Sequence, residues 1–159
     1  MNEDNILAMF LKIITEYDYL EFNEEELHED FMEILEMALV EVQLQGLVAD
    51  VEFDTENGLS EPLDRQLAYI LAHACALVWV TPKVNSSELL ATALTSTDFN
   101  LFSPSNRLQS CIKLKTDMQA KLNNLITDYD ARENYVLFKK KLEDSDKQWV
   151  HHSKDIKNV

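Results

Sequence analysis

The chain contains only two glycines and three prolines among its 159 residues, and this scarcity limits what it can fold into. Sandwiches and barrels need many tight turns, and turns draw heavily on Gly and Pro. Because 46% of the residues are apolar, the chain can still bury a substantial core. The sequence therefore predicts an all-α fold, a compact bundle of about four to five helices.

Two helices are predicted near the start of the chain. Apolar residues from Ile6 to Tyr17 recur at helical spacing, and Glu3 and Asp4 precede them, where the helix dipole favours acids. After a break at residues 18–22, Asn23 resembles an N-cap, and a second apolar stripe runs to Gly46, a typical C-cap residue.

Residues 47–60 are the least regular stretch of the interior. Val51 and Phe53 alternate with acidic residues, which is typical of an extended segment, and Asn57-Gly58 favours a turn. We expect a short irregular or hairpin-like insert here.

Three further helices are predicted downstream. A broad apolar stripe indicates a buried helix over residues 62–80, which Pro82 is expected to end. A short helix over 88–94 and a connection over 95–102 follow. Ser103-Pro104 then favours the start of a long helix over 104–129, with one apolar face and a basic edge.

The apolar pattern weakens after Asp130. A compact apolar group, Tyr135 to Phe138, precedes Lys139-Lys140-Lys141, and a polar stretch carrying Trp149 ends the chain. We expect an extended tail that is flexible alone or ordered by a partner. The predicted division is a helical domain over 1–130 and a docking tail over 131–159.

Charge is distributed unevenly along the chain. Residues 1–64 hold 19 acidic side chains and one basic one, whereas residues 65–159 hold ten acidic and thirteen basic. An acidic surface repels DNA phosphates, so sequence-specific DNA binding is not expected of the first half. Three interpretations stay open: a surface that favours solubility, a surface that DNA slides past, or a DNA-mimicking surface.

Neither a secretory signal nor a membrane span is expected. No basic flank precedes an apolar stretch at the N-terminus, and the longest apolar run, Ala74 to Val80, is far shorter than a span. Cys75 and Cys111 are expected to be free thiols in the core. These features favour the cytoplasm, or a particle assembled there.

No arrangement of residues typical of an enzyme stands out. The two glycines cannot build a phosphate-binding loop or a GxSxG elbow, and the four histidines form no HExxH motif or Cys/His quartet. Glu25-x-x-His28 matches a di-metal motif once, but such proteins need two copies. We therefore expect no enzymatic activity, no cofactor and no metal.

Dispersed positions over residues 5–45 and 63–130 resemble a known family. They include Glu16-Tyr17-Asp18-Tyr19 near the start, Trp79 to Lys83 at the end of a buried helix, Thr97-Asp98-Phe99 in a connection, and Thr127-Asp128-Tyr129 at the end of the long helix. Together they resemble the small helical head–tail connector (adaptor or neck) proteins of tailed bacteriophages.

The resemblance implies a structural virion protein rather than an enzyme. Such proteins form a ring of about twelve copies beneath the portal, contact a tail or head-closure protein, and extend the channel for double-stranded DNA. The implied location is the virion neck, assembled in the host cytoplasm.

Two groups of residues gain expected roles from this resemblance. The portal-docking residues would be Phe138, Lys139, Lys140, Lys141 and Trp149. The acidic face towards the channel would be Glu24, Glu25, Glu29 and Glu33.

Two other classes of function stay open. An acidic DNA-mimicking inhibitor would bind a basic host nucleoprotein, and its affinity would collapse in salt. An enzyme with an unrecognised helical site would need a deep pocket with convergent polar groups.

Overall fold

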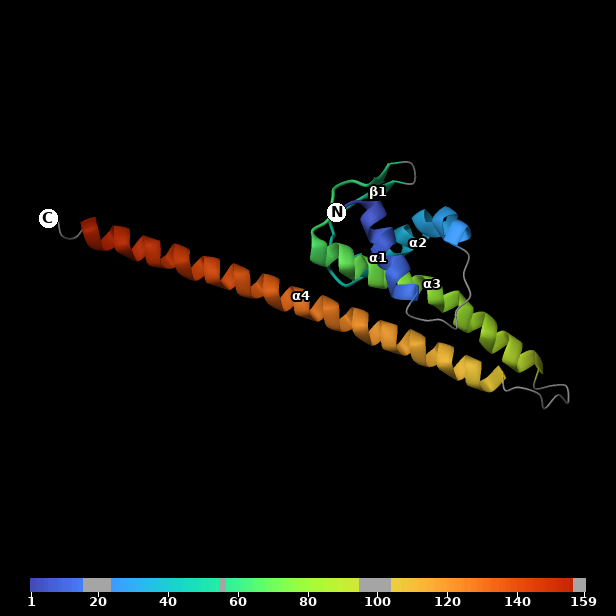
Figure 1. Cartoon of the computed structure of the whole chain (residues 1–159). Coiled ribbons are helices and arrows are strands. Elements are labelled where there is room, and N and C mark those ends of the chain that lie inside the picture. Colours follow the sequence, from blue (N-terminus) through green and yellow to red (C-terminus); the bar gives the residue numbers. More distant parts are fainter. Residues whose placement is uncertain (16–23, 55–56, 95–103, 156–159) are drawn as a thin grey trace. The chain divides into compact units, whose positions relative to one another are not determined.

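The structure of the protein, a computed structural model, describes residues 1–15, 24–54, 57–94 and 104–155. Within these residues it contains four helices and one hairpin (Figure 1), which confirms the all-α fold class. In chain order they are α1 (Glu3–Thr15), α2 (Glu24–Leu44), β1 (Phe53–Asp54), β2 (Gly58–Leu59), α3 (Arg65–Leu94) and α4 (Pro104–Asp155). The predicted break at 18–22, the Asn23 cap and the 95–102 connection lie outside the described residues.

The chain divides into two compact units, Met1–Asn124 and Leu125–Val159. Helix α4 begins in the first unit and contributes all the described residues of the second. The assignment of a helical domain to 1–130 and a docking tail to 131–159 stays a prediction.

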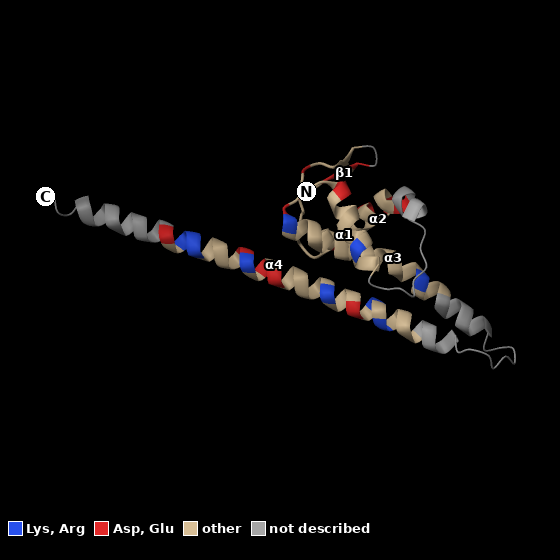
Figure 2. Ribbon diagram, viewed as in Figure 1, with Lys and Arg blue, Asp and Glu red and all other residues tan. Residues whose placement is uncertain are grey.

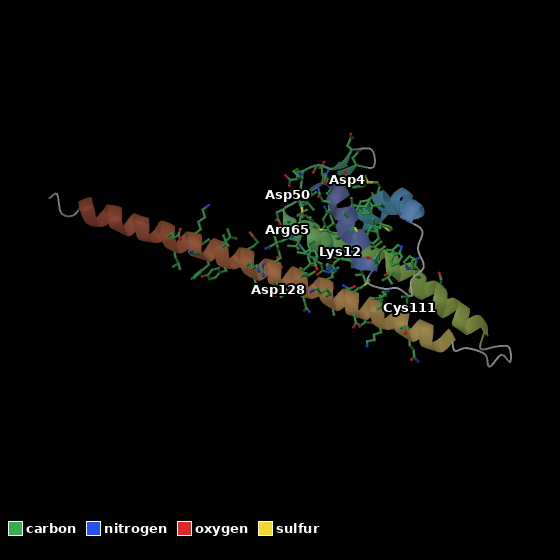
Figure 3. All side chains as sticks on the ribbon, in the orientation of Figure 1. Asp4, Lys12, Asp50, Arg65, Cys111 and Asp128 are labelled. Atoms are coloured by element: carbon green, nitrogen blue, oxygen red, sulfur yellow. The ribbon has the colours of Figure 1, made fainter. Side chains whose placement is uncertain are left out.

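The core of the first unit forms where α1 and α2 pack against α3 (Figure 1). Phe10 is fully buried there; its ring stacks on Phe31 of α2 at 6.0 Å and meets the edge of Trp79 of α3 at 6.3 Å. Figure 3 shows the side chains crowded in this region, with Cys111 labelled on α4. Cys111 and Leu114 are buried too, so one face of α4 belongs to the core.

Helix α2 ends where the sequence predicts. Gly46 has a φ of 88°, its amide donates to the Gln43 carbonyl at 2.9 Å, and the Leu47 amide donates to the Val42 carbonyl at 3.3 Å. These two bonds form a Schellman motif, in which a left-handed glycine satisfies the last carbonyls of a helix. Leu47 and Val42 are both buried, which supplies the apolar contact that accompanies the motif.

The hairpin expected near 47–60 is present as a short antiparallel pair. Phe53 pairs with Leu59 and Asp54 with Gly58. Gly58 has a φ of 78°, and a Cβ there would lie 2.4 Å from a carboxylate oxygen of Glu3. That oxygen accepts a hydrogen bond from the Leu59 amide at 2.7 Å. The positive φ favours glycine here, and a larger residue would also displace the Glu3 carboxylate that accepts this hydrogen bond.

The prediction that Pro82 ends the third helix is wrong, since α3 runs through it to Leu94 and includes the short helix expected at 88–94. Pro82 cannot donate a hydrogen bond to the preceding turn. Val80 and Val84, on either side of it, are nevertheless buried. Packing of α3 against its neighbours outweighs the loss of one backbone bond.

The predicted end of the long helix at Tyr129 is also wrong. Helix α4 continues to Asp155, over residues expected to form an extended tail. No Gly or Pro occurs after Pro104, and the segment is rich in Lys, a good helix former. The weakening apolar pattern therefore marks a change in what the helix contacts, not its end.

Truncating Phe10 should test the core. We expect Phe10→Ala to lower the free energy of unfolding by about 3–5 kcal/mol, because it leaves a cavity between two aromatic rings. The exposed Ile112 of α4 is the matched control, and Ile112→Ala should change stability by less than about 0.5 kcal/mol. Urea unfolding followed by circular dichroism gives both values, and equal losses would contradict this account of the core.

Candidate functional site

The predicted docking residues lie in the second unit. Phe138 and the three lysines at 139–141 are exposed on consecutive positions of α4. Trp149 falls within the bounds of the same helix, but its side chain lies outside the described residues. The docking role of this group stays a prediction.

The predicted acidic face belongs to α2. Glu33 is exposed on this helix. The side chains of Glu24, Glu25 and Glu29 lie outside the described residues, so the grouping of all four stays a prediction. Figure 2 shows acidic residues on the described part of the first unit, and both signs of charge along α4.

An exposed apolar stripe runs along α4 in the second unit. Tyr135, Phe138 and Leu142 are 67%, 59% and 51% exposed. Their spacing of three and then four residues places them on one face of the helix. Lys139 and Lys141 lie at positions that flank this face on its two sides. We call these five residues the α4 stripe.

A second exposed apolar stripe lies on α2 and was missed in the sequence. Met37, Val40 and Leu44 are 46%, 50% and 78% exposed, and they have the same spacing of three and four residues. They lie opposite the buried positions Leu35, Ala38 and Val42. Glu36 and Glu41, both exposed, flank the stripe on its two sides. We call these five residues the α2 stripe.

A groove of about 620 Å³ adjoins the α2 stripe within the first unit. Three helices line it: Glu36, Met37, Val40 and Glu41 from α2, Leu77, Val78, Thr81 and Pro82 from α3, and Lys115 and Gln119 from α4. Its volume is in the range of pockets that accept a ligand or a large side chain. Because the surface that lines it is mostly apolar, the groove is better suited to apolar side chains than to a reacting polar substrate.

Among the residues that the structure describes, His73 is the buried polar side chain of the core. Its Nε2 atom makes no hydrogen bond within the described residues, and its ring meets the edge of Tyr69 at 4.6 Å. Burial, with a smaller contribution from the positive charge of Lys121, lowers the pKa of His73 to about 4. The imidazole is therefore neutral at physiological pH. His73 is therefore a core residue rather than a group poised to titrate near neutral pH.

The cysteines match their prediction as buried free thiols. Burial raises the pKa of the Cys75 thiol, which suppresses the thiolate that a nucleophile needs. Neither Cys75 nor His73 is thus tuned as a catalytic group by its surroundings. Within the ranges that the structure describes, no group of three His, Cys, Asp or Glu side chains could hold a metal ion.

Residues 65–86 of α3 are long and apolar enough to cross a membrane by length and composition. Two thirds of the apolar window is buried inside the protein, as in the core helix of a helical bundle. The segment is longer than the apolar run noted in the sequence because only His73 separates that run from another apolar run, Leu67 to Ala72. The burial accounts for its composition without a membrane.

Comparisons with protein-family models, with curated proteins and with solved structures find no match to this chain.

His73 should make stability depend on pH. A histidine with a lowered pKa in the folded state takes up its proton more readily when unfolded, so protonation favours unfolding. The wild type should lose stability relative to His73→Leu as pH falls from about 6.5 to about 4, where both states become protonated. The difference should exceed about 1 kcal/mol across this window. Urea unfolding at several pH values measures it, and parallel curves for the two proteins would contradict the neutral buried imidazole.

Proposed function

We propose that the chain is a structural connector that joins other proteins of an assembly, and that the assembly is the neck of a tailed bacteriophage. The observation that carries a structural role is the α4 stripe with its neighbours. Tyr135, Val136, Leu137, Phe138 and Leu142 are all at least half exposed within eight residues of one helix. Exposed clusters of large apolar and aromatic residues are typical of protein contact sites.

The chemistry of the first unit supports a role in binding over a role in catalysis. The surface that lines the groove is mostly apolar, although half of its lining residues are polar, and the buried His73 and Cys75 are held in forms unsuited to proton transfer or nucleophilic attack at neutral pH. An enzyme with an unrecognised helical site would need polar groups that converge on one reacting atom.

The phage assignment rests on the dispersed sequence resemblance described above. In that role several copies form a ring beneath the portal protein and contact a tail or head-closure protein. The acidic first half of the chain then disfavours adhesion of passing DNA, because like charges repel.

Copy number in virions should test this function. We expect about one copy of this chain per portal subunit in purified, DNA-filled particles, because rings that share an axis commonly match or nearly match in number. Quantitative mass spectrometry with labelled peptides of both proteins gives the ratio. Absence from virions together with abundance in infected cells would overturn the connector role and favour the acidic inhibitor.

Contact with the portal should depend on the lysines of α4. We expect neutralising Lys139, Lys140 and Lys141 together to Gln to weaken binding to purified portal rings by about tenfold or more at low salt. The matched control replaces the same lysines with Arg, which keeps the charge and should bind as the wild type does. Surface plasmon resonance compares the three proteins, and unchanged binding by the Gln variant would remove these lysines from the contact.

A further inference from the structure

The α2 stripe and the α4 stripe complement each other. Each has three apolar residues at one face of a helix with the same spacing, so one set can interdigitate with the other along a helix–helix contact. The flanking charges are opposite in sign, Glu36 and Glu41 on α2 and Lys139 and Lys141 on α4. Flanking pairs of this kind fix the partner and the register of packed helices.

The groove beside the α2 stripe can receive a large side chain of the α4 stripe. Two of the three apolar residues of the α2 stripe, Met37 and Val40, form part of its wall, and Leu77 and Val78 of α3 form another part. A large aromatic side chain such as Phe138 fits a mostly apolar cavity of about 620 Å³. Lys115, which also lines the groove, carries a charge opposite to that of acidic residues beside the α4 stripe, such as Glu143.

We infer that the α4 stripe of one copy docks on the α2 stripe and the adjoining groove of a second copy. The apolar residues of the two stripes pack together, Phe138 enters the groove, and Lys139 and Lys141 lie against Glu36 and Glu41. Each copy uses two different surfaces, so the contact is heterologous. Repetition of a heterologous contact gives a ring where the rotation closes and a filament where it does not.

This inference deepens the proposed function, since it names the surfaces through which copies of the connector join. The two can fail separately. Self-association is measured on the purified chain alone, whereas the connector role is measured in virions. The α4 stripe then acts on portal binding through assembly of the ring, so loss of its lysines weakens portal binding because copies no longer join. Portal binding by a chain that stays monomeric would overturn the inference.

Exchange of the flanking charges tests the pairing. Full-length chains carry Glu36→Lys with Glu41→Lys, or Lys139→Glu with Lys141→Glu, or all four changes. Each pair alone places like charges together and should raise the dissociation constant of self-association by about tenfold or more at low salt. The fourfold variant restores opposite charges and should recover most of the affinity.

Analytical ultracentrifugation over a range of concentrations measures these constants, and circular dichroism checks that each variant keeps its helical content. Recovery in the fourfold variant supports the pairing, because an unrelated effect of each change would not cancel. A wild type that stays monomeric up to about millimolar concentration, or a fourfold variant that associates no better than either pair, would overturn it.

The apolar part of the contact has a matched control on the same helix. Phe138 and Val136 are nearly equally exposed, but Val136 lies on a different face from the α4 stripe. We expect Phe138→Ser to raise the dissociation constant of self-association by about tenfold or more, and Val136→Ser to leave it within about twofold of the wild type. Equal effects of the two changes would mean that general apolar exposure, not the α4 stripe, drives association.

Cross-linking separates this contact from a symmetric one. One chain carries Val40→Cys and the other carries Phe138→Cys, while the native Cys75 and Cys111 are buried and should not compete under native conditions. A disulfide should form rapidly when the two chains are mixed and far more slowly in either chain alone. Rapid disulfide formation in the Phe138→Cys chain alone would show that the α4 stripe pairs with itself, and would overturn the inference.

Discussion

The packing of α3 against α1 and α2 is the contact on which the first unit depends. Phe10 of α1 lies at its centre, where its ring contacts Phe31 of α2 and Trp79 of α3. Residues 68–77 of α3 are almost entirely buried, apart from the half-exposed Tyr69. This burial also carries α3 past Pro82, where the sequence alone favours an end. Thr81 and Pro82, which line the groove beside Leu77 and Val78, lie on the helix because it continues there.

The sequence correctly predicted the features that a few neighbouring residues determine, such as a helix end and a turn. Gly46 ends α2 through a motif set by a few neighbouring residues, and Asn57-Gly58 gives a turn because Gly58 tolerates a positive φ. Predictions of the same kind failed at Pro82 and after Tyr129. At Pro82, tertiary packing outweighs a missing amide. After Tyr129, helix propensity persists although the regular core spacing of apolar residues stops.

The α2 stripe shows why a surface is harder to predict than a core. Met37, Val40 and Leu44 recur at helical spacing, as the buried residues of the same helix do. Both sets are apolar, and the sequence does not state which set faces the neighbouring helices. The packing of α2 against α3 is what leaves Met37, Val40 and Leu44 exposed to solvent. The α4 stripe was easier to find, because Tyr135 and Phe138 stand beside three lysines in an otherwise polar segment.

The side chains of residues 131–143 are all exposed. Along this stretch the helix is therefore held by its own backbone hydrogen bonds and by neighbouring side chains a turn apart, with no core to protect it. Its amide protons would exchange with solvent almost as they do in an isolated helical peptide. Any protein that covers one face would slow that exchange along the covered face and its flanks. The rate of deuterium uptake in this stretch thus records whether the helix is occupied, in a purified chain or in a whole particle alike.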